Sequence, residues 1–382
     1  MGSGHQWHPQ IEPSRQRWPL VPALRQDEIF SSWLARCALN HACSPLELAH
    51  QLWPQQQVWM RDCDRCVSQL ELGELATLSG ILMRDLVSSS LLLICRLLGS
   101  PIPSTKITPW VLCLGARSTR RAGGLQFCPL CFSEPSPYYR IQWRLAWNTC
   151  CPIHYVQLRD CCPRCSATIS PHRLASTAKT LSRCHRCDAY LAEARAVEAS
   201  SAALAFARQA DSVVAAQQCQ FGSKQLSASE WFGLLRWVHH LVRDLVRHRA
   251  QAGRVFLGAF DIDMNEFPTA SLGLPLECLS SSDRTLFLGA VQRIACRGVD
   301  GIVAAIAQAA LPASLYRSPA GVTERCLGIL HNPLPCARAA PTKRRGERNP
   351  AHSRASVLRK WQRFKRKAVR CEVGLAGPRS ST

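Results

Sequence analysis

The chain has 382 residues, a formal net charge of +21 and 21 cysteines. This length is typical of two or three domains, and an apolar content of 47% is enough for packed cores. Such a basic balance favours a polyanionic partner such as nucleic acid. A membrane span is not expected, because the longest apolar run, Leu91–Leu98, contains Arg96 and is much shorter than the ~20 residues required.

The amino-terminal residues lack the apolar core of a signal peptide, so we expect a cytoplasmic protein with reduced thiols. Many cysteines in a reducing compartment indicate metal binding rather than disulfides. The positive charge is concentrated near the end, where residues 338–370 hold 13 lysines and arginines against one acid, Glu347. This pattern predicts a basic tail over 338–382 that contacts DNA, or alternatively a disordered end that only adds solubility.

After an extended lead-in at 1–27, residues 28–112 have the pattern of a helical domain. The apolar residues between Ile29 and Ala38 share one helical face. Ser44-Pro45-Leu46-Glu47 has the form of a capping box. Within 68–98, two leucine-rich stripes flank a turn at Ser79-Gly80, which favours a helix-turn-helix or another small helical bundle.

Residues 113–190 contain four pairs of metal-ligand residues, each separated by two residues. Two such turns can direct four ligand atoms at one tetrahedral zinc ion. Pairing in sequence order predicts one site of three cysteines and a histidine and one site of four cysteines, although interleaved pairing stays open. Each set would fill all four positions of the ion, which is typical of structural zinc. The predicted ligands of the two zinc ions are Cys128, Cys131, Cys151, His154, Cys162, Cys165, Cys184 and Cys187.

Other residues near these pairs have less certain roles. Cys150 and Cys161 adjoin predicted ligands and could replace them, whereas Cys63 and Cys66 have the spacing but no second pair nearby. Tyr139, Trp143 and Trp147 recur every four residues, which predicts a helix that packs its aromatic face over the first site. Basic residues around the second site could contact phosphate or could simply be solvated. The candidate nucleic-acid contacts are Arg164, Arg173, Arg183, Arg186, Lys343, Arg344, Arg345, Arg359, Lys360, Arg363, Lys365, Arg366 and Lys367.

Residues 191–337 are expected to form a second helical domain. An alanine-rich helix is predicted over 191–218, an amphipathic helix over 229–249, and two further helices over 283–297 and 302–311. Residues 254–278 contain Gly, Pro and Asp and are predicted to be irregular. The fold class is therefore mainly α, with a helix-turn-helix-like amino-terminal domain, central tandem zinc ribbons, and a carboxyl-terminal helical region with a basic tail.

The sequence offers no residues for catalysis. It has no GxxxxGK[ST] phosphate loop and no acidic triad suited to metal-dependent strand transfer. We therefore expect a protein that is not an enzyme; a zinc enzyme would need an open coordination position.

Several motifs occur in the order typical of one family. Residues 27–36, DEIFSSWLAR, resemble the opening motif of the TniQ/TnsD family of transposition targeting proteins. Residues 124–131, GLQFCPLC, resemble the family's first cysteine turn, and Tyr138-Tyr139-Arg140, Trp143-Arg144-Leu145 and the next two ligand pairs follow in order. The resemblance extends over roughly 19–190. Tyr155 stands where the family usually has glycine.

The resemblance implies a non-catalytic adaptor of a heteromeric bacterial DNA transposition system, and it places the family's zinc ligands on the eight residues named above. Such an adaptor recognises target DNA or an RNA-guided targeting complex and recruits an AAA+ ATPase regulator, which in turn brings in a DDE transposase. The implied location is the bacterial cytoplasm near the nucleoid, without a membrane, and the chain could form a homodimer. The alternative is a stand-alone zinc-dependent transcription regulator that binds DNA or RNA.

Overall fold

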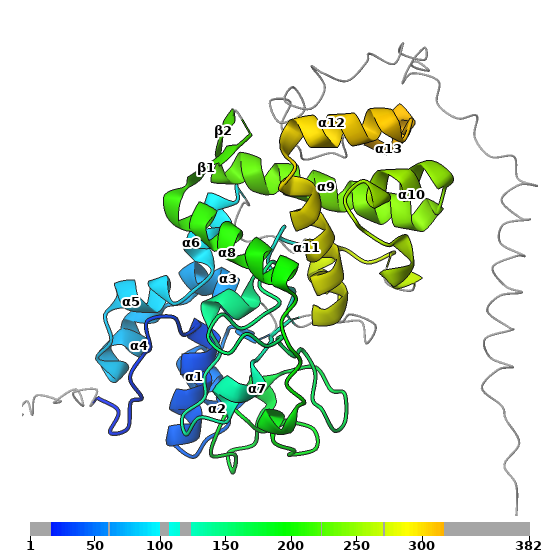
Figure 1. Ribbon diagram of the computed structural model, residues 1–382. Coiled ribbons are helices and arrows are strands. Elements are labelled where there is room, and N and C mark those ends of the chain that lie inside the picture. The colour runs from blue at the N-terminus through cyan, green and yellow to red at the C-terminus, as the bar shows by residue number, and fades with distance from the viewer. Residues whose placement is uncertain are drawn as a thin grey trace, which may run out of the picture. The chain divides into compact units, whose positions relative to one another are not determined.

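The computed structural model describes residues 17–59, 62–99, 107–114, 124–222, 224–269 and 272–316, which belong to one compact unit. The fold is mainly α, with an irregular cysteine-rich segment between two groups of helices (Figure 1). No helix in these described ranges has the length and apolar character needed to cross a membrane. The predicted basic tail, and residues 1–16 of the predicted lead-in, lie outside the described residues.

The amino-terminal group consists of short helices, as the sequence predicts. Ser44 begins α2 with the predicted capping box, because its hydroxyl accepts a hydrogen bond from the Glu47 amide at 3.2 Å and the Glu47 carboxylate accepts one from the Ser44 amide. The predicted turn is also confirmed, since Gly80 ends α4 in the left-handed conformation with φ +70°. The helices are α1 (Phe30–Asn40), α2 (Pro45–Leu52), α3 (Cys63–Cys66), α4 (Leu72–Ser79), α5 (Met83–Ser88) and α6 (Leu92–Leu97), with a 3₁₀ turn at Val67–Gln69.

Helix α1 lies between two hydrophobic cores. Phe30, Trp33 and Leu34 pack into the core of the amino-terminal helices. Ile29 and Ala35 belong to the larger core, which the cysteine-rich segment shares with the carboxyl-terminal helices. Because both faces of α1 are covered, even its serines Ser31 and Ser32 are buried.

The cysteine-rich segment has little regular structure. It contains the one-turn helix α7 (Pro129–Phe132) and 3₁₀ turns at Ile141–Arg144, Pro171–Arg173 and Leu191–Glu193. The helix predicted from Tyr139, Trp143 and Trp147 is wrong, because isolated β-bridges at Arg140 and Leu145 flank the 3₁₀ turn. The expected burial of the three aromatic rings is nevertheless correct, since each is at most 1% exposed.

The carboxyl-terminal group contains the longest helices. In α9, Ser227 and Glu230 form a second capping box, and the helix matches the predicted range within one residue at each end. The predicted helix over 191–218 is shorter than expected, and its last residue instead starts a β-hairpin. Part of the region predicted to be irregular is helical, namely α10. The elements are α8 (Ser201–Ala216), β1 (Gln218–Phe221), β2 (Lys224–Ser227), α9 (Ala228–His248), α10 (Gln251–Gly258), α11 (Ser281–Ala295), α12 (Gly298–Gln308) and α13 (Ala313–Tyr316), with 3₁₀ turns at Met264–Glu266 and Leu276–Cys278.

One core joins the cysteine-rich segment to these helices. Helix α11 packs against both α8 and α9 (Figure 1). Trp110 lies among Trp147, Phe206 and Phe232, with ring-centroid separations of 6.3, 6.1 and 5.5 Å. Its indole N–H donates to the Phe232 carbonyl at 3.2 Å. The segment boundaries at 112/113 and 190/191 stay a prediction.

His239 is an unusual member of this core. Its side chain is 1% exposed, and neither ring nitrogen has a hydrogen-bond partner in the described part of the chain. Its ring lies 5.4 Å from the ring of Phe287. Burial lowers the pKa of His239 well below its usual value, and the charges of His240, Arg243 and Arg236 lower it further. The fold therefore holds this imidazole neutral.

We expect His239 to make the stability of the fold depend on pH. The unfolded chain takes up a proton near the ordinary histidine pKa of about 6.5, whereas the folded chain does not. The associated stability is therefore present above that pH and is lost as the pH falls below it. The difference in unfolding free energy between His239→Leu and wild type should therefore rise by about 1 kcal/mol in favour of the variant as the pH falls from 6.5 to 5.5. Both chains are measured by urea titration with zinc present. The exposed His248→Leu is the control, and a gain for His239→Leu that is the same at both pH values would contradict the assignment.

Candidate metal centres

Three of the four predicted ligand turns share one backbone geometry. In the turn that starts at Cys151, the Tyr155 amide donates to the Cys151 carbonyl at 2.9 Å, and the Cys151 amide donates to the Val156 carbonyl at 2.8 Å. The turns that start at Cys162 and Cys184 repeat both bonds at distances of 2.9–3.0 Å. A β-bridge closes each turn, pairing Cys150 with Gln157, Cys161 with Thr168 and Arg183 with Tyr190. The repeated ligand spacing thus produces a repeated structural unit.

The residue after the second ligand of each of these turns has a positive φ. The angles are +52° at Tyr155, +55° at Ser166 and +56° at Asp188. This left-handed conformation suits glycine and strains most other residues. The glycine usual in the family therefore has a conformational reason, and Tyr155 adopts the same backbone conformation without displacing His154.

The first turn is built differently. Cys128 precedes α7 with Pro129 at its first helical position, and the Phe132 amide donates to the Cys128 carbonyl at 3.0 Å. Proline is favoured there because its fixed φ suits the helix and no N–H is needed. The helical turn places Cys128 and Cys131 on the same side of the first centre.

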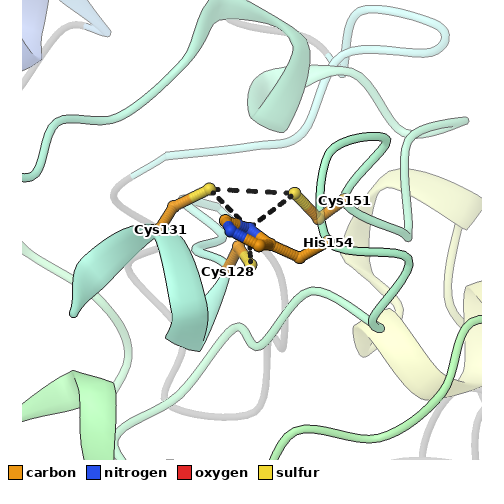
Figure 2. A group of neighbouring side chains, drawn as sticks. All are labelled: Cys128, Cys131, Cys151 and His154. Carbon is orange, nitrogen blue, oxygen red and sulfur yellow. Dashed lines mark hydrogen bonds between the residues drawn. The ribbon is translucent and has the colours of Figure 1, made fainter. Parts of the chain in front are cut away.

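The first four predicted ligands converge from two directions (Figure 2). Cys128 and Cys131 come from the turn at α7, whereas Cys151 and His154 come from the following turn. The His154 Nδ1 atom lies 3.5, 3.2 and 3.7 Å from the sulfurs of Cys128, Cys131 and Cys151. The three cysteines are at most 4% exposed, so this cluster lies within the main core.

The second set of ligands forms a separate cluster nearer the surface. The Cys162 and Cys187 sulfurs are 3.6 Å apart, and those of Cys165 and Cys184 are 3.7 Å apart. Cys165 and Cys187 are half-buried, whereas Cys162 and Cys184 are buried. In both clusters, all four ligand atoms lie within 4.8 Å of one another. The structure therefore groups the pairs in sequence order rather than interleaved.

These dimensions fit tetrahedral zinc. Bonds of about 2.3 Å to sulfur and about 2.0 Å to nitrogen require sulfur–sulfur separations of about 3.8 Å and sulfur–nitrogen separations of about 3.5 Å. The Cys131 and Cys151 sulfurs are 3.8 Å apart, the two sulfur–sulfur distances given for the second cluster are 3.6 and 3.7 Å, and the sulfur–nitrogen distances are 3.2–3.7 Å. Three thiolates with an imidazole, or four thiolates, are donor sets that zinc prefers. Both clusters could hold a metal ion, and each would then have four protein ligands.

The electrostatics of the clusters also favour a bound cation. Contacts with Cys128 and Cys151 raise the pKa of Cys131 far above its usual value, while contacts with Cys128 and Cys131 lower the pKa of Cys151 to about 2. These opposite shifts reflect how closely the three sulfurs of the first cluster are packed. In the second cluster, the Arg186 amide points at the Cys184 sulfur at 3.4 Å, a contact that stabilises a thiolate.

The neighbouring cysteines lie outside both clusters. Cys150 and Cys161 precede ligands, but each sits in the β-bridge that closes its turn. Cys63 and Cys66 lie on α3 and join neither group among the described residues. Burial raises the pKa of Cys63 well above its usual value, which is typical of an inert core thiol.

The motifs at 27–36 and 138–144 contact each other directly. Asp27 binds both the Arg140 guanidinium and the Tyr138 hydroxyl, the latter at 2.9 Å. The Tyr139 amide donates to the Ser32 hydroxyl at 3.0 Å, and the Ile29 amide donates to the Tyr139 carbonyl. These residues therefore attach α1 to the segment that carries the first cluster.

Arg144 is the most deeply buried part of this attachment. Its guanidinium is fully buried and contacts Asp62 at 2.6 Å and Asp64 at 2.5 Å. Asp64 also accepts hydrogen bonds from the amide and hydroxyl of Ser31 on α1. Burial raises the pKa of Asp64 to about 6, although Arg144 lowers it. In this stretch the residues that contact Arg144 are Asp62 and Asp64 rather than the cysteine pair Cys63 and Cys66.

Gln126 and Arg284 form a second connection that the sequence did not reveal. The buried Arg284 donates to the Gln126 side-chain oxygen at 2.6 Å. Gln126 in turn donates to the carbonyls of Trp143 and Asn148, each at 3.0 Å. Helix α11 is thereby connected, through Gln126, to the backbone between the two ligand turns of the first cluster.

The described candidate nucleic-acid contacts lie around the second cluster. Arg164, Arg173 and Arg186 are exposed. Arg183 is instead engaged internally, because it donates to the Asp188 carbonyl at 2.8 Å and lies over the Tyr190 ring. The candidates between Lys343 and Lys367 lie outside the described residues.

Part of the chain is similar to a known protein family. Residues 19–158 match the TniQ family. The match includes the ion cluster of Arg144 with Asp62 and Asp64 and all four ligands of the first cluster, whereas the second cluster lies beyond it. No curated protein matches the chain.

Proposed function

Residues 19–158 form a TniQ domain, which makes the chain a transposition-associated protein of that family, and from this premise we propose that it is a non-catalytic target-selection adaptor. In this role it recognises target DNA or an RNA-guided targeting complex and recruits an AAA+ ATPase regulator. The ATPase then brings in the DDE transposase. We place this activity in the bacterial cytoplasm, at the nucleoid, with the adaptor acting either alone or as a homodimer.

The observation that carries the proposal is that the residues matched by the family include the whole first cluster. The match includes the four residues that could hold the first ion, so the metal-binding fold is part of the TniQ domain itself. We assign zinc to both clusters. Four protein ligands per ion leave no position for a water nucleophile, which supports a structural role over a catalytic one.

The structural role fits an adaptor. The cysteine-rich segment has almost no regular secondary structure, so metal binding would supply much of its stability. Arg144 attaches it to Asp64 on α3, and Gln126 attaches it to Arg284 on α11. Zinc would therefore fix the relative positions of the helices that meet the partners.

The proposal is tested by retention of the ATPase encoded in the same mobile element. The zinc-loaded full chain is immobilised, and the ATPase is applied with ATP. We expect ATPase to be retained on this chain and not on a surface carrying a zinc-ribbon protein of another family. No retention, together with nanomolar sequence-specific binding of DNA or RNA by the chain alone, would instead favour the stand-alone regulator.

A further inference from the structure

A hollow of about 730 Å³ lies beside the second cluster. Its walls come from residues 174–180 and from the turn that carries Cys184 and Cys187. Three cations line it, namely Lys179, Arg183 and Arg186, against the single acid Asp188. The charged side chains that line the hollow are therefore mainly cationic, and part of its wall is the metal-binding turn.

Arg183, one of the three cations, forms internal contacts in the wall of the hollow. The Arg183 guanidinium donates to the Asp188 carbonyl at 2.8 Å and lies 3.3 Å from the Asp188 carboxylate. It also stacks over Tyr190 at 3.4 Å from the ring centroid. Arg183 and Tyr190 are joined by the β-bridge that closes the turn. Arg183 thus neutralises Asp188 and holds Tyr190 against the hollow, which makes it a positioning residue.

The other two cations, Lys179 and Arg186, are not held in this way. Lys179 and Arg186 are exposed, and neither forms an ion pair within the described part of the chain. The only carboxylate lining the hollow, that of Asp188, is paired with Arg183. Four thiolates on one zinc ion would carry a net charge of −2 beside the hollow, which Lys179 and Arg186 would balance while their exposed side chains stay available to a phosphate.

We propose that this hollow binds a backbone phosphate of the target DNA, with Lys179 and Arg186 as its ligands. The inference rests on the proposed function and identifies where the adaptor touches DNA directly. A guanidinium can hold two phosphate oxygens at once, and an ammonium adds a mobile point charge. The candidate contacts predicted from the sequence included Arg183 and Arg186 but not Lys179. The proposal adds Lys179 as a phosphate ligand and gives Arg183 only a supporting role.

The test compares two doubly substituted chains with equal loss of charge. Lys179→Ala/Arg186→Ala removes the proposed ligands, whereas Lys224→Ala/Arg254→Ala removes an exposed lysine and an exposed arginine outside the hollow. Affinity for a fluorescein-labelled 30-base-pair duplex is measured by anisotropy from 50 to 200 mM KCl. Zinc content is measured for each chain to show that both clusters remain loaded.

We expect the hollow variant to bind the duplex about tenfold more weakly at 100 mM KCl. The slope of log K against log [KCl] should fall by about 0.9 in magnitude, which is the contribution of the one phosphate contact that is lost. The control variant should lose less affinity and keep most of its slope. Equal losses in both variants would overturn the proposal.

Two further measurements separate free phosphate from DNA phosphate as the ligand, and the role of the hollow from the adaptor role. Inorganic phosphate titrated into the wild-type chain should bind only weakly; tight binding of inorganic phosphate together with duplex affinity unchanged in the hollow variant would overturn the assignment to DNA. The hollow variant should still retain the ATPase. Loss of ATPase retention by the wild-type chain would refute the adaptor role but would leave the duplex measurement to decide on the hollow.

Discussion

Replacing Cys151 by serine should reduce the bound zinc from two ions per chain to one and unfold the region around the first cluster. Serine is a poor zinc ligand, and Cys151 is 0% exposed within the core shared with the carboxyl-terminal helices. A structural zinc site contributes about 10–16 kcal/mol of binding free energy in small peptides. Since an entire domain is stable by only about 5–15 kcal/mol, loss of this ion should remove most of the stability of the fold.

The neighbouring cysteine provides a matched control. Cys150 is also buried, but it lies in the β-bridge that closes the turn and outside the ligand cluster. Cys150→Ser should therefore keep two zinc ions and lose only a few kcal/mol at most. Zinc is counted by elemental mass spectrometry and unfolding by circular dichroism. Two ions and unchanged unfolding in Cys151→Ser would refute the ligand assignment.

Replacing Arg144 by methionine should destabilise the chain by about 3–5 kcal/mol, the second largest effect that we expect. The substitution leaves Asp64, which is 0% exposed, without its cation in an interior that penalises an unpaired charge. Burial lowers the pKa of Arg144, but the charges of Asp62 and Asp64 raise it by more. The guanidinium therefore remains charged. The change in unfolding free energy is measured by urea titration at neutral pH with zinc present.

The acids supply the test of this mechanism. In the triple variant Arg144→Met/Asp62→Asn/Asp64→Asn, no charge is left buried without a partner. We expect it to recover a large part of the stability lost by Arg144→Met alone, because removing a whole buried ion cluster costs less than breaking it. If the triple variant is less stable than the single one, the loss arises from packing of the arginine rather than from charge.

The grouping of the eight cysteine and histidine residues into two clusters was predictable, because zinc coordination imposes a local rule. Two residues between ligands allow one turn to supply two donor atoms, and this requirement is visible without any knowledge of the fold. The same holds for the Ser44 cap and for α9, whose apolar residues recur at helical spacing. In each case, the controlling interactions lie within a few residues along the chain.

Features that depend on distant residues were not predictable in this way. Tyr139, Trp143 and Trp147 have helical spacing, yet long-range bridges from Arg140 to Glu28 and from Leu145 to Val111 hold the backbone extended on either side of a single 3₁₀ turn. The pairing of Arg144 with Asp62 and Asp64 joins residues about 80 positions apart. Nothing in the local sequence around either partner indicates such a contact.

The adaptor role is tested most directly by the frequency and positions of insertions in cells that carry the transposase and ATPase of the same element. We predict that insertions at the preferred target require this chain and are lost with Cys151→Ser but kept with Cys150→Ser. Insertions of the same frequency and distribution in cells that lack the chain would contradict it.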